Sequence, residues 1–252
     1  MSDLAADLDL IRDAAEAAGR LALAERRTCA RLARRSRMNL IAAIEWAEGY
    51  HRRGLYSPIG VTFHWLMAGL MIFQLAYGWY LGWQPVGGDK YVGYQTHTQV
   101  GLTIMLLGTL RFFWHSQITG PENVDESSFA GKASRLLQTW FYFSFFALPI
   151  SGWVMWSTLP SDLPLSVAGL IPFPNLPFDQ LSEGLQHRLM RWAATTHFWI
   201  VWITALIIPG HAGAAVLHYV IKRDRVLPSM FDLNGPDSPG VVGSAPDKGS
   251  VA

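Results

Sequence analysis

Long stretches without charged residues dominate the pattern of hydrophobic and polar positions along the chain. Four intervals contain no Asp, Glu, Lys or Arg: Arg53 to Asp89, Lys90 to Arg111, Arg135 to Asp162 and Arg191 to Lys222. Each leaves about 20 or more mostly apolar residues, enough for a helix rising ~1.5 Å per residue to cross a hydrocarbon core of ~30 Å. The pattern predicts four transmembrane helices, at residues 59–83, 92–114, 135–158 and 192–221.

The basic residues near the helix ends predict an orientation. Four crossings place both termini on one side, which holds Arg52, Arg53, Arg111, Lys132, Arg135, Lys222, Arg223 and Arg225. The opposite side holds Lys90, Arg188 and Arg191. Because basic residues collect on the cytoplasmic side of a membrane, we expect a multi-pass protein of a bacterial inner membrane with both termini in the cytoplasm.

The segments on either side of the charge-free region differ from it. Residues 1–54 are expected to be a cytoplasmic extension, partly helical, because Leu4, Leu8 and Ile11 follow helical spacing among acidic residues. An arginine-rich stretch from Arg26 to Arg37 suits the anionic inner leaflet. The alternatives are that the extension has no role, or that Met38 is the true start. Residues 55–231 form the predicted membrane domain, and residues 232–252, rich in Gly, Pro and Ser, a disordered tail.

Composition narrows the classes further. Half of the 252 residues are hydrophobic, 15% are charged, and the formal net charge is +1, which excludes a disordered chain and argues against nucleic acid as a partner. One cysteine cannot build a disulfide framework or an all-cysteine metal site.

Histidines inside the predicted spans carry the candidate chemistry. Of eight in the chain, His64, His97, His197 and His211 lie within spans, where ionisable groups are costly and mark functional sites. In the alternating topology His64 and His211 lie at the cytoplasmic depth, and His97 and His197 at the opposite one. His197 and His211 are 14 residues apart, close to four whole turns, and so share one face of the last helix.

Two imidazoles facing each other at one depth can hold a haem iron from both sides. No Cys, Asp or Glu lies in any span to complete a zinc site, and small residues near the histidines (Gly60, Gly101, Gly210, Ala212, Gly213, Ala214 and Ala215) leave room for a flat macrocycle or for close helix packing. We therefore predict an all-α membrane protein, a four-helix bundle with two haems b in its core. Iron with both axial positions filled by protein suits electron transfer.

Further polar residues extend this prediction. Arg111 with His115 on one side, and His187, Arg188 and Arg191 on the other, are placed to bind haem propionates or to act as interfacial anchors. His218, seven residues beyond His211, could exchange the proton of quinone chemistry, with Thr62 as a hydrogen-bond donor to the same ligand. A propionate partner or an interfacial histidine is the alternative for His218.

Several motifs resemble the bacterial cytochrome b561 family of di-haem membrane cytochromes. They are Tyr56-Ser57-Pro58 leading to Phe63-His64-Trp65, His97-Thr98-Gln99-Val100-Gly101, Ala147-Leu148-Pro149-Ile150-Ser151-Gly152, and His197 followed by His211 and His218. The resemblance covers about residues 55–231. It implies that His64 and His211 ligate one haem b and that His97 and His197 ligate the other, as the depth argument also indicates.

The resembling family is similar in turn to the cytochrome b subunits of nickel–iron hydrogenases and formate dehydrogenases, which pass electrons to quinone. One branch oxidises superoxide and reduces ubiquinone. We therefore expect an electron carrier between a periplasmic redox partner and ubiquinone or menaquinone in the lipid bilayer. The alternatives are a superoxide:ubiquinone oxidoreductase and the membrane-anchor haem subunit of a dehydrogenase or hydrogenase complex.

Overall fold

The computed structural model describes residues 2–52, 55–118, 128–159, 163–222 and 226–231. The chain divides into two compact units, residues 1–47 and 48–252. The first unit consists of helix α1, which runs from Ser2 to His51 and crosses the boundary between the units. The helix is longer than the partial helix predicted from the leucine spacing, and the predicted tail at residues 232–252 lies outside the described residues.

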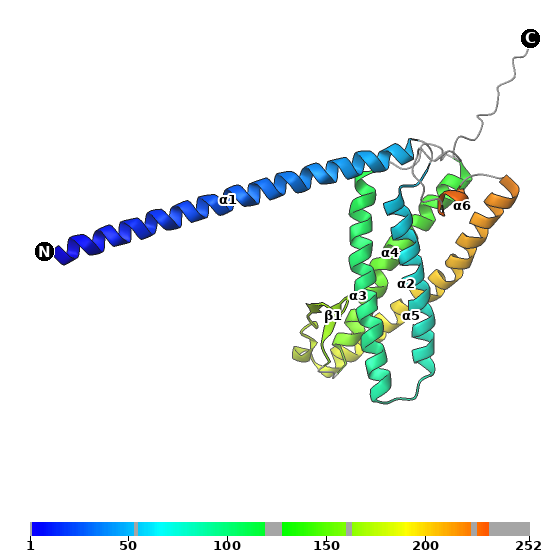
Figure 1. Ribbon diagram of the computed structural model, residues 1–252. Helices are drawn as coiled ribbons and strands as arrows, with labels where there is room; N and C mark the ends of the chain where they lie inside the picture. Colours follow the sequence, from blue (N-terminus) through cyan, green and yellow to red (C-terminus); the bar gives the residue numbers. More distant parts are fainter. Residues whose placement is uncertain (1, 53–54, 119–127, 160–162, 223–225, 232–252) are drawn as a thin grey trace, which may run out of the picture. The chain divides into compact units, whose positions relative to one another are not determined.

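The second unit is built mainly from four long helices (Figure 1). They are α2 (Pro58–Trp83), α3 (Gly88–Gln117), α4 (Phe129–Ser157) and α5 (Glu183–Leu217). A π-helical turn, η2 (His218–Lys222), continues α5, and the short helix α6 (Val226–Ser229) follows. The all-α class predicted from the sequence is confirmed for the described residues, apart from one small hairpin.

Local sequence signals explain where two of these helices begin. The hydroxyl oxygen of Ser57 accepts a hydrogen bond from the backbone N–H of Gly60 at 3.3 Å, and Pro58 occupies the first helical position of α2. Proline suits that position because its missing N–H would have no intrahelical partner. Ser128 caps α4 in the same way, accepting from the N–H of Gly131 at 3.0 Å. Helix α2 thus starts one residue before its predicted span at residue 59, and α4 starts six residues before its predicted span at residue 135.

Helix α5 extends furthest beyond its predicted span, since it starts at Glu183 whereas the charge-free interval gave residue 192. Charged residues such as Arg188 and Arg191 end a hydrocarbon span but do not end a helix. The charge pattern therefore predicts the apolar part of a helix and misses the turns outside it.

A β-hairpin occupies part of the connection between α4 and α5, where we expected no strand. Strands β1 (Leu165–Val167) and β2 (Ile171–Phe173) pair antiparallel, and Ala168 and Gly169 in the turn have φ of 54° and 71°. The backbone N–H of Ala168 donates to Thr103 Oγ1 at 2.8 Å, so the hairpin lies against α3. Figure 1 shows it beside that helix. A 3-10 turn, η1 (Phe178–Gln180), precedes α5.

The core of the second unit draws on all four long helices. Met67 and Met71 of α2, Ile104 of α3, Phe145 and Leu148 of α4 and Ile200 of α5 form one buried cluster. Nearby, the indole N–H of Trp140 donates to Thr204 Oγ1 at 3.1 Å, and the Ser144 hydroxyl lies 3.2 Å from the same oxygen. Hydrogen bonds of this kind between apolar helices hold them in one register.

Length and hydropathy mark two helices of the described chain as able to cross a membrane. They are α2 and the combined helix Glu183–Ile221, and only 22% and 11% of their most apolar windows are buried. A core helix of a water-soluble protein would be mostly buried. The other two predicted spans, 92–114 and 135–158, contain Arg111 and Arg135 respectively, and they also include Gln, Thr, Ser and Gly residues that lower their mean hydropathy.

Candidate cofactor site

The four histidines of the predicted spans come together as two pairs. The rings of His64 on α2 and His211 on α5 have their centres 6.2 Å apart. The rings of His97 on α3 and His197 on α5 have theirs 6.3 Å apart. Each pair therefore joins α5 to another helix, and the structure brings together the residues that the depth argument pairs.

Both separations suit two imidazoles that share one metal ion. An imidazole nitrogen binds a transition metal at about 2.0 Å, and the ring centre lies about 1.1 Å behind it, so opposed ligands have centres about 6.2 Å apart. Rings in direct van der Waals contact face to face would lie closer. The donor chemistry also fits, because no group of three or more His, Cys, Asp or Glu that could hold a metal ion occurs among the described residues. Two nitrogen donors per site are the set that haem takes from a protein.

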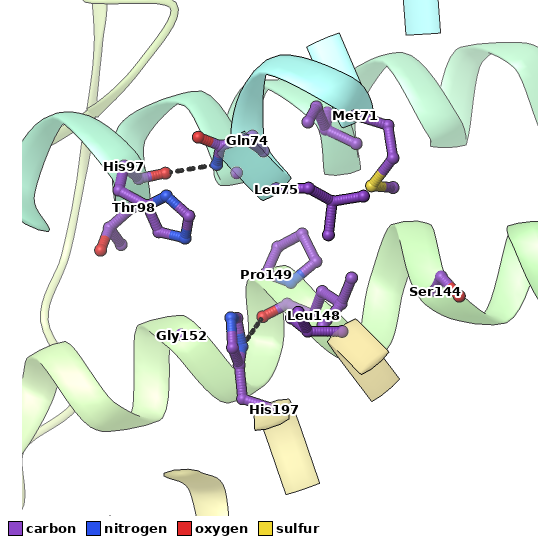
Figure 2. Close-up of a pocket in the computed structure, with 13 residues that line it drawn as sticks. Met71, Gln74, Leu75, His97, Thr98, Ser144, Leu148, Pro149, Gly152 and His197 are labelled. Carbon is purple, nitrogen blue, oxygen red and sulfur yellow. Dashed lines mark hydrogen bonds between the residues drawn. The ribbon is translucent and has the colours of Figure 1, made fainter. Parts of the chain in front are cut away.

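Hydrogen bonds from α4 orient the ring of His197. Its Nδ1 lies 3.1 Å from the carbonyl oxygen of Leu148 and 2.9 Å from the hydroxyl oxygen of Ser151. Figure 2 shows the ring facing Leu148. A proton on Nδ1 can be donated to these acceptors, which leaves Nε2 free as a ligand. The motif that contains Ser151 thus supplies the tautomer that a metal ligand needs.

His97 is positioned by α2 instead. The carboxamide Nε2 of Gln74 donates to the backbone carbonyl of His97 at 2.7 Å, and Gln74 is only 8% exposed. Gly78, one turn further along α2, faces the imidazole edge, and a methyl group there would lie 3.1 Å from Cε1 of His97. Gly152 faces the ring of His197 less closely, with 3.8 Å for the same comparison. These two glycines leave space for the rings.

The small residues singled out in the sequence have other surroundings. Gly60 lies at the Ser57 cap, and Gly101 packs near Gln74 and Pro149. A methyl group at Gly210 or Gly213 would meet nothing within 4 Å. Gly78 and Gly152 touch the histidines but are distant from them in sequence, so helical spacing from a histidine could not identify them.

A cavity of about 470 Å³ adjoins the His97–His197 pair. Its size is in the range of cofactor pockets, and its walls are mostly apolar. Aromatic and polar side chains that line it include Trp79, Lys90, Tyr91, Tyr94, Trp156 and Trp202. Three buried polar atoms of residues on its wall have no hydrogen-bond partner within the described chain: Gln74 Oε1, His97 Nδ1 and Trp156 Nε1. This end of the unit has both the room and the unsatisfied polar groups expected of a ligand site.

The His64–His211 pair has a different setting. Trp65 meets the His64 ring edge-on at 5.3 Å, and Phe141 meets the His211 ring at 5.7 Å. The side chain of His211 is exposed. The Trp65 indole N–H donates to the carbonyl of Met230 at 2.7 Å, which fixes the start of α2 to the segment after α6. Aromatic rings, with fewer hydrogen bonds, flank this pair.

The predicted propionate contacts fall at the two ends as follows. Arg111 is half-buried and lies close enough to His64 to act on it electrostatically. His115, just beyond the predicted span 92–114, stacks on Tyr142 at 6.4 Å. Burial, the positive charge of Arg111 and that of His51 lower the pKa of His115. At the other end His187, Arg188 and Arg191 are exposed and do not line the cavity at His97 and His197.

Lys90 is a basic residue at that cavity which the sequence reasoning did not assign to the site. Its ammonium group donates to the carbonyl of Gln84 at 2.9 Å and lies 5.8 Å from the ring centre of Tyr94. Lys90 precedes His97 by seven residues, close to two helical turns, so helical spacing places both on one face of α3. This seven-residue spacing is the feature of the sequence that could have assigned Lys90 to the site.

The predicted quinone residues are close in sequence to the His64–His211 pair, because Thr62 lies two residues before His64 and His218 lies seven residues after His211. His218 is half-buried and begins the π-helical turn η2, and Thr62 is exposed on α2. Neither residue lines the cavity at His97 and His197. π-Helical turns interrupt regular helices at functional sites more often than elsewhere.

Comparisons with known proteins identify a family to which the chain is similar. The family model described as prokaryotic cytochrome b561 matches residues 55–232. Among curated proteins of Escherichia coli K12, the chain is similar to cytochrome b561 homolog 2, with 24% identity over 184 residues that cover 72% of this chain and 94% of the relative. It is also similar to cytochrome b561 homolog 1, with 25% identity over 180 residues that cover 70% and 96%. The region matched by the family model contains both histidine pairs and leaves out all of α1.

Proposed function

Because the chain belongs to the prokaryotic cytochrome b561 family, whose members are membrane-bound b-type cytochromes of electron transfer, we propose that it carries electrons through two bis-histidine haems b. The two haems would lie at opposite membrane depths. The observation that carries the proposal is the pair of ring separations, 6.2 and 6.3 Å, each suited to one shared metal ion.

The residues that would hold the two groups are His64 with His211, and His97 with His197. A haem iron with two histidine ligands supplies a reversible one-electron couple and no open coordination position for a substrate. What the protein contributes is orientation. Ser151 and Leu148 fix the tautomer of His197, while Gln74 and Gly78 set the place of His97.

The region between the two histidine pairs supports electron transfer along the membrane normal. His197 and His211 are on the same helix, 14 residues apart, which is about 21 Å at ~1.5 Å per residue. The buried cluster of Met67, Met71, Ile104, Phe145, Leu148 and Ile200 belongs to the same four helices and contains no ionisable group. An apolar interior of this kind excludes water between the two sites.

We further propose that α2, α3, α4 and α5 form a four-helix bundle that crosses the bacterial inner membrane four times with both termini in the cytoplasm. The family is membrane-bound, and two of the four helices pass the hydropathy test by themselves. The largely exposed apolar surfaces of α2 and α5 support contact with lipid. The bias of basic residues supports the orientation.

The two ends would then serve different partners. The cavity end at His97, with Lys90, Arg188 and Arg191, would face a periplasmic redox protein or dehydrogenase subunit. His218 and Thr62 would bind ubiquinone or menaquinone near the cytoplasmic side, at the end of the His64–His211 pair. The π-helical turn at His218 supports a functional role for that segment.

A reduced-minus-oxidised spectrum of the purified full chain, combined with a haem count per protein, tests the proposal. We expect b-type bands and two haems per chain. In vesicles with a membrane-impermeant reductant in the outer solution and a quinone inside, the haems should pass electrons to the quinone. A purified, folded protein without b-type bands would overturn the proposal.

A further inference from the structure

Gln74 is a buried polar residue on α2, a helix that is otherwise mostly apolar. It is uncharged and is not one of the proposed haem ligands. Its carboxamide lies between the two histidine depths, and it lines both the cavity of about 470 Å³ and a smaller one of about 50 Å³ in the core. Figure 2 shows it beside His97, across the small cavity from Leu148 and His197. Burying an amide in an apolar helix is costly unless each of its polar atoms has a partner.

Of the two polar atoms of this carboxamide, one has a hydrogen-bond partner among the described residues and the other has none. Nε2 donates to the His97 carbonyl at 2.7 Å, whereas Oε1 has no donor among the described residues. The Nδ1 atom of His97 is likewise buried without a partner there. The partner ring contrasts with this, because Nδ1 of His197 meets both Leu148 O and Ser151 Oγ. The protein therefore stabilises the two rings of one pair by different means.

Resting on the proposed function, we infer that Gln74 is a positioning residue that holds the His97 ligand in place and favours the oxidised state of the haem bound by His97 and His197. The reasoning concerns charge. A carbonyl oxygen without a donor in a medium of low dielectric constant stabilises positive charge nearby. Oxidation of the iron adds one positive charge at this pair and none at the distant His64–His211 pair.

The sign of the effect follows. Removing the oxygen makes oxidation harder, so the midpoint potential of one haem rises while the potential of the other stays the same. Replacing the amide by a carboxyl group with the same reach keeps an oxygen at the position and adds negative charge when ionised, so the potential of the same haem falls. The hydrogen bond to the His97 carbonyl is lost in the apolar variant and also in the ionised carboxylate, which has no hydrogen to donate, so both variants should hold the haem less tightly.

The test is a potentiometric titration of the purified full chain, followed by visible spectra that resolve the two haems. Gln74→Met preserves length and volume without hydrogen bonding, Gln74→Glu preserves an oxygen, and Met67→Leu changes a buried α2 side chain outside both cavities. We expect Gln74→Met to raise the reduced-to-oxidised ratio of one haem at fixed potential by about threefold to tenfold, the range one hydrogen bond produces. Gln74→Glu should lower it, and Met67→Leu should leave both haems unchanged.

The outcomes separate this inference from the proposed function. Two b-type haems with unchanged potentials in Gln74→Met, or equal shifts of both haems, would overturn the role of Gln74 alone. A wild-type chain without b-type bands would overturn the proposed function. If Gln74→Met fails to retain haem, Gln74→Glu decides, since a potential that does not fall there contradicts the charge argument.

Discussion

The His97–His197 pair and the His64–His211 pair have nearly the same ring separation but very different surroundings. At the first pair, Leu148 and Ser151 of α4 form hydrogen bonds with the His197 ring, and Gln74 of α2 positions His97. A cavity of about 470 Å³ adjoins both histidines. At the second, aromatic rings flank the histidines and His211 is exposed. The helices therefore set the ring spacing in both pairs, whereas hydrogen bonds fix the ring orientation mainly in the first pair.

Removing one ligand from each pair tests whether the two sites are separate. We expect His197→Ala and His211→Ala each to lose one haem of two, with the other haem keeping its spectrum, because the proposed function gives each pair its own iron. His218→Ala is the matched control on the same helix face and should retain both. Haem content and difference spectra measure this; both haems retained in His197→Ala and His211→Ala would show that the pairing is wrong.

Ser151 tests the hydrogen-bonded orientation that distinguishes the first pair. Ser151→Ala removes the oxygen 2.9 Å from Nδ1 of His197, and we expect haem retention at that site to weaken by about tenfold to 100-fold, as for other partners of metal-bound histidines. Ser144→Ala deletes a buried hydroxyl of the same helix that bonds to Trp140 and Thr204 instead. Equal loss in both variants would mean that the effect is general packing.

The two glycines at the first pair provide a graded test. Gly78→Ala would place a methyl group 3.1 Å from the His97 ring, whereas Gly152→Ala would place one 3.8 Å from the His197 ring. The first contact is too short, so the ring must move by a few tenths of an ångström. We expect a shifted spectrum and a weaker haem site in Gly78→Ala and a near-normal protein in Gly152→Ala. The reverse order would contradict this account of the His97 position.

The smallest expected effect concerns the other end and depends on pH. Because the pKa of His115 is lowered in the folded chain, the unfolded chain binds more protons as the pH falls through the unperturbed value of about 6.5. Stability should therefore decrease on acidification from pH 7.5 to 5.5, and His115→Gln should reduce that decrease. Thermal denaturation at both pH values measures it, and an unchanged pH dependence in the variant would contradict it.

Much of the fold was predictable from charge, because burying Lys or Glu in hydrocarbon is costly, and each of the four charge-free intervals overlaps one of the long helices α2, α3, α4 and α5. The family was predictable from its motifs. The helix ends were harder to predict from charge. Helix α5 starts at Glu183, and the charged residues of its first turns end a charge-free interval without ending the helix. The β1–β2 hairpin was missed because its strands have three residues each and depend on contacts with α3.

The candidate site divides in a similar way. The histidines were found because polar groups in apolar helices stand out, and their pairing follows from alternating helix direction. Lys90 was within reach of the same helical spacing. Gln74 and Gly78 were not, because their importance comes from contacts between α2 and α3 that one helix does not reveal.

Low-temperature electron paramagnetic resonance of the oxidised full chain tests the central claim most directly. Two histidine pairs, each holding one iron, predict two low-spin ferric signals of equal intensity, one lost in His197→Ala and the other in His211→Ala. A single low-spin signal in the wild-type protein, or high-spin iron with an open position, would contradict the account.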